Sequence, residues 1–172
     1  ASLKSKAQIF TGANPNFQKF AVMLKDYYNK GLLGKPYCME AEYIHWYMPK
    51  SNETVHLNEN GDWRRLLIPI RYCTHSLGPI FFSLEKRPKK VTGFEGKMGE
   101  RCARMGKLAA PFGMEIVELE DGTLIKSVHG GLYKHNTWYS MYGTKGRLET
   151  ARASAGTGSY TRLYAEYDPF EG

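Results

Sequence analysis

The hydrophobic positions near the start of the chain change from a helical period to a strand period. Apolar side chains recur every three or four residues from Phe17 to Leu32, which predicts an amphipathic helix. Asn14 is a possible N-cap for this helix, Pro15 suits its first turn, and the Gly- and Pro-containing residues 31–36 suit its end. Residues 6–12, before it, are expected to form a short strand.

Residues 37–48 alternate as in one long strand. Its two faces are Cys38, Glu40, Glu42, Ile44 and Trp46 on one side, and Tyr37, Met39, Ala41, Tyr43, His45 and Tyr47 on the other. Glu40 and Glu42 therefore share a face, where paired carboxylates could perform acid–base chemistry. On a half-exposed strand such carboxylates more often face water, and we interpret both that way. We interpret His45, on the aromatic face, as structural.

The rest of the chain predicts one more helix and a series of strands. The expected elements are a long polar loop over 49–62, a helix from Pro79 to about Lys86, and strands over 90–98, 114–119, 123–133, 137–142, 147–151 and 161–167. Asp121-Gly122 marks one hairpin, and residues 144–146 mark another, in which Gly146 suits a positive φ. Strands grouped after helices favour an α+β fold: a large, mostly antiparallel sheet with helices packed on one face.

One stretch, residues 70–79, concentrates the hydrogen-bonding and ionisable side chains. It contains Arg71, Tyr72, Thr74, His75 and Ser76 between two apolar segments. An unpaired buried polar group costs roughly 1–3 kcal/mol, so these groups need partners or a function. From this stretch alone, a satisfied core histidine and a functional imidazole are equally good interpretations.

A second candidate is Trp63 with Arg64, which closes the polar loop. An aromatic ring beside a guanidinium is a plausible wall for a polyhydroxylated or anionic ligand. A surface Trp–Arg stack remains the simpler alternative.

Composition narrows the classes of protein. The 172 residues fit one domain, and 42% hydrophobic content is ample for a core. A net charge of +7 suggests nucleic acid, but the basic residues are scattered and their densest cluster, 86–90, falls in an expected turn. No apolar run approaches membrane-spanning length, the first residues lack the apolar core of a signal peptide, and no metal-binding pattern is present. Three cysteines without a CxxC pair favour a reduced, cytoplasmic setting.

Several landmarks together resemble the C-terminal domain of the Gfo/Idh/MocA family of NAD(P)-dependent oxidoreductases. They are Asn14-Pro15, the helix end at 31–36, Glu42-Tyr43-Ile44-His45, Tyr72-Cys73-Thr74-His75-Ser76-Leu77-Gly78-Pro79 and Tyr142-Gly143-Thr144-Lys145-Gly146. The resemblance extends from about Lys6 to Ala153. It implies a dihydrodipicolinate-reductase-like domain whose sheet bears substrate on one side and often builds a homo-oligomer on the other.

The resemblance also implies that the nucleotide site lies elsewhere. In that family NAD or NADP is bound mainly by an N-terminal Rossmann domain, which this chain does not contain. Residues 1–12 would be the tail end of that domain, and residues 13–172 the substrate-binding and oligomerisation domain. The family's catalytic lysine, from a Glu-Lys-Pro motif, would belong to the missing part. The chain by itself is therefore expected to be inactive.

The family pattern points to His75 as the catalytic residue of this half. A neutral imidazole suits the removal of a hydroxyl proton during hydride transfer. Tyr72, three residues earlier, would share its face and bond the same hydroxyl. Many members have an aspartate where this chain has Arg71, which suggests a different substrate or reaction. Arg71, Trp63 and Arg64 are the substrate-binding candidates.

The favoured function is thus hydride transfer to or from a sugar, a sugar derivative or a cyclitol. One alternative is an NAD-dependent glycoside-cleaving enzyme of the same superfamily, whose Tyr-Pro-Thr-His-Gly stretch resembles residues 72–76 with Cys73 and Ser76 substituted. Another is a non-catalytic binding or assembly domain, in which His75 and Tyr72 would point into the core with no pocket beside them. Nucleic-acid binding is a minor fourth possibility.

Overall fold

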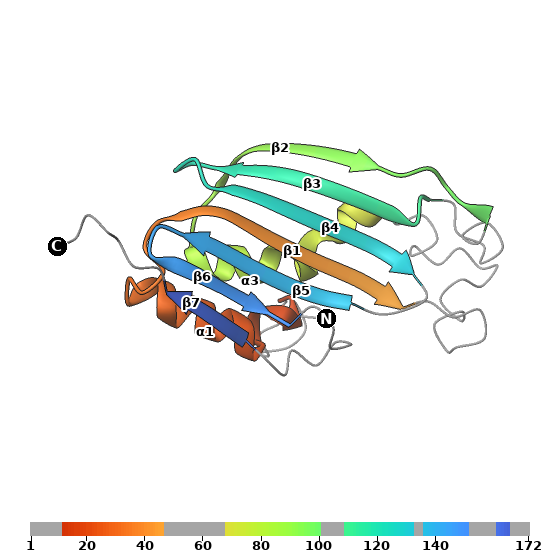
Figure 1. The fold of residues 1–172 in the computed structure, drawn as a ribbon. Helices are drawn as coiled ribbons and strands as arrows, with labels where there is room; N and C mark the ends of the chain where they lie inside the picture. Colours follow the sequence, from red (N-terminus) through yellow and green to blue (C-terminus); the bar gives the residue numbers. More distant parts are fainter. Residues whose placement is uncertain (1–11, 47–67, 101–108, 133–135, 152–160, 166–172) are drawn as a thin grey trace, which may run out of the picture.

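A single sheet carries the helices of the described chain on one of its faces (Figure 1). The computed structural model describes residues 12–46, 68–100, 109–132, 136–151 and 161–165. The helical elements are η2 (Asn14–Phe17), α1 (Lys19–Asn29), η4 (Pro69–His75) and α3 (Leu77–Leu84). Within the described ranges, no helix is long and apolar enough to cross a membrane.

The sheet has seven strands in the order β2-β3-β4-β1-β5-β6-β7. They are β1 (Pro36–Trp46), β2 (Pro88–Glu95), β3 (Phe112–Leu119), β4 (Leu124–Leu132), β5 (Asn136–Gly143), β6 (Gly146–Thr150) and β7 (Thr161–Ala165). Strand β1 lies at the centre, parallel to β4 and antiparallel to β5, and the other pairs are antiparallel. The predicted α+β fold, with a mostly antiparallel sheet and helices on one face, is confirmed.

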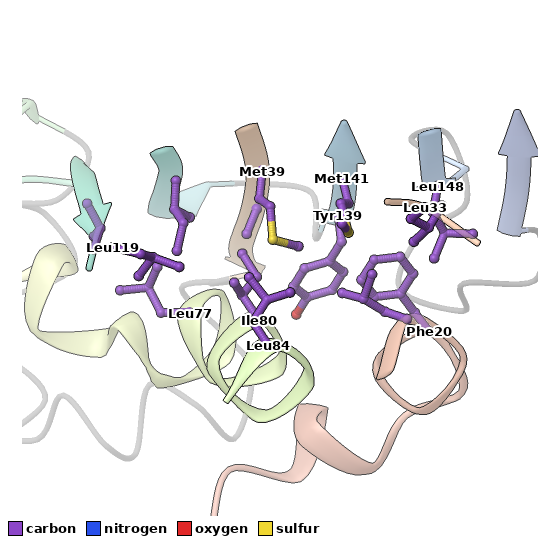
Figure 2. Packing of buried hydrophobic residues seen from close by; sticks show 14 residues of the cluster. Phe20, Leu33, Met39, Leu77, Ile80, Leu84, Leu119, Tyr139, Met141 and Leu148 are labelled. Carbon is purple, nitrogen blue, oxygen red and sulfur yellow. The ribbon is translucent and has the colours of Figure 1, made fainter. Parts of the chain in front are cut away.

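The core lies between the sheet and the two α-helices. Figure 2 shows Met39 and Met141 pointing from β1 and β5 toward Ile80 of α3, while Phe20 of α1 stacks on Tyr139 with ring centroids 5.0 Å apart. Burying each such side chain contributes roughly 1.5–3 kcal/mol. The buried positions of α1, which are Phe20, Ala21 and Leu24, thus face the strands, whereas Phe17 and Leu32 at the ends of the predicted pattern are exposed.

The opposite face of β1 carries the two glutamates, as the alternation predicts. Each has its own polar partner on a neighbouring strand: Lys126 Nζ lies 3.2 Å from a Glu40 carboxylate oxygen, and Asn136 donates to Glu42 at 2.6 Å. The two carboxylates therefore bind different partners and do not act as a pair, which is consistent with a structural role on this face.

Some predicted boundaries are wrong. Residues 14–17 form a separate 3-10 helix preceded by Ala13, so Asn14 is not an N-cap; α1 begins only at Lys19 because Gln18 is extended. Strand β2 begins at Pro88 and ends at Glu95, earlier at both ends than residues 90–98. The predicted strand 6–12 and loop 49–62 lie outside the described residues, apart from Gly12, which is not in a strand.

The prediction for Gly146 is also wrong. Among the described glycines, those with positive φ are Gly31, Gly34 and Gly122. Gly146 instead lies in β6, opposite Gly143. The hairpin needs glycine at 143, because a Cβ there would lie 2.0 Å from the carbonyl oxygen of Leu33 in the segment after α1. Glycine is thus required because the hairpin and the segment after α1 approach each other closely, and not because of the turn conformation.

We expect Gly143→Ala to destabilise the chain by about 1–3 kcal/mol, because backbone atoms of the 33–35 segment must move to admit the methyl group. Urea denaturation followed by circular dichroism measures this change. Gly99→Ala is the matched control, since a Cβ at Gly99 meets nothing within 4 Å. Equal unfolding free energies for the two variants would contradict this account of the hairpin.

Candidate functional site

The candidate site is built on η4, the 3-10 helix that ends at His75. This helix lies against the helix-facing side of β3 because Gly113 leaves room for it: a Cβ at Gly113 would lie 2.6 Å from Ile70 Cγ2. The chain bends inside η4 at Tyr72, which has φ −101° and ψ 32°, and continues into α3 at Ser76. The stretch of polar residues singled out in the sequence is thus held on the sheet as one short helical unit.

Two tyrosine rings contact the imidazole of His75. Tyr72 stacks on it with ring centroids 4.7 Å apart and planes inclined by 21°, since residues three apart in a 3-10 helix lie on the same face. The ring of Tyr43, on β1, contacts the imidazole from the sheet side, with ring centroids 4.6 Å apart. The prediction that Tyr72 and His75 share a face is confirmed.

Hydrogen bonds position the main chain and ring of His75. The Tyr139 hydroxyl donates to the His75 carbonyl oxygen, and burial raises the pKa of this phenol, so it stays protonated as a donor. The Thr74 hydroxyl lies 3.0 Å from His75 Nδ1. Among the described residues, Nε2 has no hydrogen-bond partner, so it is the ring nitrogen left for a ligand.

An open cleft of about 590 Å³ lies beside this ring. It is lined by Thr74 and His75 on one side and by Gly12, Ala13 and Asn14, which precede η2 and begin it, on the other. His75 therefore opens toward the N-terminal segment and is not enclosed by aliphatic side chains. An assembly domain with no pocket beside His75 does not fit this geometry.

The surroundings keep the imidazole of His75 neutral at neutral pH. Its pKa is lowered from the ordinary value of about 6.5 first by burial, which disfavours the cation, and then by the nearby charges of His45 and His129. A neutral ring with an unbonded nitrogen at a cleft can accept a proton.

The other candidates fall differently. Arg71 is exposed and is not among the residues that line the cleft. Trp63 and Arg64 lie outside the described residues. Within the described ranges no cluster of three His, Cys, Asp or Glu side chains could hold a metal ion. The structure thus brings His75 and Tyr72 together and leaves Arg71 at the periphery.

Sequence reasoning missed part of the site. Tyr43 contacts both His75 and Tyr72, and His45, interpreted as structural, lies close enough for its charge to lower the pKa of His75. The available signal was the alternation of β1, which placed Tyr43 and His45 on the helix-facing side. Tyr139 carried no signal, because its partner is a backbone carbonyl 64 residues away in sequence.

Solved structures of oxidoreductases share this fold. An inositol dehydrogenase homolog from Azotobacter vinelandii complexed with NAD+ matches with a TM-score of 0.67 at 12% identity, over 92% of this chain and 44% of its own. Scyllo-inositol dehydrogenase from Lactobacillus casei, with NAD(H) and scyllo-inositol, matches with a TM-score of 0.59 at 17% identity. The match covers 80% of this chain and 40% of the dehydrogenase. Myo-inositol 2-dehydrogenase from Lactobacillus plantarum matches with a TM-score of 0.61 at 14% identity. The match covers 83% of this chain and 42% of the dehydrogenase.

The chain has the fold of a Gfo/Idh/MocA-type C-terminal domain. It spans less than half the length of the three solved structures named above. No protein-family profile and no curated protein sequence matches it. At these identities the likeness establishes the fold alone.

We expect the His75 imidazole to titrate below pH 6.5, because burial and two neighbouring histidines oppose its protonation. His45→Gln should raise the midpoint, since it removes one repelling charge. Since the unfolded chain takes up this proton at a higher pH, the free energy of unfolding should fall as the pH drops below the ordinary histidine range. Histidine ring proton shifts in NMR spectra report the midpoint, and a midpoint at or above 6.5 would contradict the assignment.

Proposed function

We propose that this chain is the substrate-binding half of an NAD(P)-dependent oxidoreductase that acts on a sugar, a sugar derivative or a cyclitol. The observation that carries the proposal is a neutral imidazole, stacked on a tyrosine, at the edge of an open cleft. The shared fold supports it, because the similar structures include proteins named as inositol dehydrogenases.

The nucleotide in this proposal belongs to a separate domain. No glycine-rich turn leads from a strand into a helix in the described residues, so this part of the chain offers no phosphate cradle of the dinucleotide-binding type. We assign residues 1–12 to the end of a preceding nucleotide domain and residues 13–172 to the substrate-binding domain. A nicotinamide cofactor bound by that domain would supply the hydride chemistry.

His75 acts as the base in this proposal. For Nε2 to accept a hydroxyl proton, Nδ1 must carry the ring hydrogen and donate it to Thr74 Oγ1, 3.0 Å away. The 3.0 Å contact allows that tautomer, and the lowered pKa keeps Nε2 unprotonated until the reaction delivers its proton. A base of this kind contributes roughly 10²–10⁴ in rate.

The remaining substrate contacts follow from position. Tyr72, stacked on the imidazole, would bond the same hydroxyl as His75. Arg71, exposed one residue earlier, would reach only a substituent that projects out of the cleft. Trp63 and Arg64 remain lower-ranked candidates for substrate binding. Self-association through the face of the sheet opposite the helices remains a prediction.

His75→Asn in the full-length enzyme should lower turnover at least tenfold, because the amide cannot accept the hydroxyl proton. Initial rates of NAD(P)H formation with inositols and hexoses measure the effect. Circular dichroism and thermal melting serve as the control for folding, which should be unchanged. Wild-type turnover in the variant would remove His75 from the catalytic role, and cleavage of a chromogenic glycoside with catalytic NAD would favour the glycosidase alternative.

The 172-residue chain alone should bind NAD(H) negligibly, because the phosphate-binding elements lie outside it. Isothermal titration calorimetry of the chain with NADH, beside the full-length protein under the same conditions, tests this. Binding in the submicromolar range by the chain would contradict the proposed division into domains.

A further inference from the structure

A cluster of four buried polar side chains lies beneath the end of η4. It consists of Glu115 on β3, Ser127 and His129 on β4, and Ser76 at the junction of η4 and α3, with relative exposures of 4%, 0%, 1% and 0%. We call it the inner cluster. Neither an amphipathic pattern nor the proposed proton transfer accounts for it, and all four members are too buried to meet a substrate.

The cluster is organised around one nitrogen atom. His129 Nε2 lies 2.9 Å from Ser76 Oγ, 2.7 Å from Ser127 Oγ and 2.9 Å from Glu115 Oε2. The two serine hydroxyls are 2.9 Å apart. The approach of His129 to Glu115 is electrostatic and poorly directed, because neither carboxylate oxygen accepts a well-aligned hydrogen bond from the described residues. His129 is thus a polar neighbour of the buried carboxylate.

The Ser76 hydroxyl donates to the carbonyl oxygen of Cys73, 3.2 Å away. Ser76 Oγ is then left to accept a hydrogen bond, either from Ser127 Oγ, 2.9 Å away, or from His129 Nε2 when that nitrogen carries the ring hydrogen. The chain of donors ends on the backbone of η4, two residues before His75.

Strand pairing places His129 of the inner cluster beside Tyr43, which contacts the His75 ring. In the sheet, Gly113 lies opposite His129 on one side, and Tyr43 lies beside His129 on the other. Tyr43 in turn contacts the His75 ring. The inner cluster therefore joins β3, β4 and the η4–α3 junction, next to the residue that supports the imidazole.

We propose that Ser76 is a positioning residue through which the inner cluster holds the end of η4 on the sheet and keeps the His75 ring stacked on Tyr72 at the cleft. The assignment of this geometry to catalysis rests on the proposed function. The geometry itself does not, so the two can fail separately.

The chain offers a matched pair of variants for the structural test. Ser83 is also buried, at 1% exposure, and its hydroxyl bonds the carbonyl oxygens of Ala21 and Pro79, away from the inner cluster. In Ser76→Ala, nuclear Overhauser effects between the His75 and Tyr72 ring protons should fall by at least half. In Ser83→Ala they should keep their wild-type intensity. Unchanged intensity in Ser76→Ala would overturn the proposal.

A further variant guards against misfolding. Should Ser76→Ala not fold, Ser127→Ala removes the hydroxyl hydrogen-bonded to Ser76 and leaves Ser76 bonded to the carbonyl oxygen of Cys73. It should also weaken the ring contact, by less than Ser76→Ala would. An unaltered contact in a folded Ser127→Ala would count against the cluster.

Kinetics of the full-length enzyme test the consequence for catalysis. Ser76→Ala should lower kcat at least fivefold and change the KM for the cyclitol less than twofold, because alignment of the base matters most in the transition state. Ser83→Ala should stay within twofold in both. A wild-type kcat for Ser76→Ala would overturn the catalytic consequence. Absence of dehydrogenase activity in the wild type would overturn the proposed function, while the ring contacts would still decide whether Ser76 positions His75.

Discussion

The candidate site depends on one contact, the packing of the short helix η4 against the helix-facing side of the sheet. Most of that side is apolar, and α1 and α3 cover it with hydrophobic side chains. Beneath η4, a carboxylate, an imidazole and two hydroxyls lie buried together. Buried polar groups are stable only when paired, so the position of η4 is constrained by hydrogen-bond geometry in addition to packing.

This constraint explains how His75 can be half-buried and still open to a ligand. Tyr139 donates a hydrogen bond to its carbonyl oxygen, its ring contacts both Tyr43 and Tyr72, and its neighbour Ser76 is hydrogen-bonded beneath the helix. The ring is thereby desolvated enough to lower its pKa, while one edge borders the cleft with Gly12–Asn14. A base positioned by its backbone and neighbours needs little reorganisation when a proton must move.

The distribution of polar groups differs between the two faces of the sheet. On the outer face, glutamates pair with a lysine and an asparagine on adjacent strands, in contacts that are partly buried. On the inner face, Glu115 and His129 are removed from water, so each depends on the other. Glutamate thus pairs with single partners on adjacent strands on the outer face, and belongs to a buried polar cluster on the inner face.

Much of the fold could be read from local patterns. The helical spacing of Phe17 to Leu32, the alternation along residues 37–48 and the Asp121-Gly122 turn each predicted an element that the structure contains, because these signals come from residues close in sequence. The proximity of Tyr72 to His75 followed from their spacing of three. A predicted boundary was wrong where the backbone is extended inside the helical pattern, at Gln18, and Gly146 was chosen where Gly143 carries the steric requirement.

The sequence by itself determined the fold class, the element order and the stretch that holds the candidate base. Only the tertiary structure decided what surrounds that base: the approach of Tyr43 and His45, the bond from Tyr139, and the burial of Glu115 with His129. These contacts join residues from separate strands whose alignment depends on sheet order and register. No local periodicity encodes that register, because it results from packing the whole sheet at once.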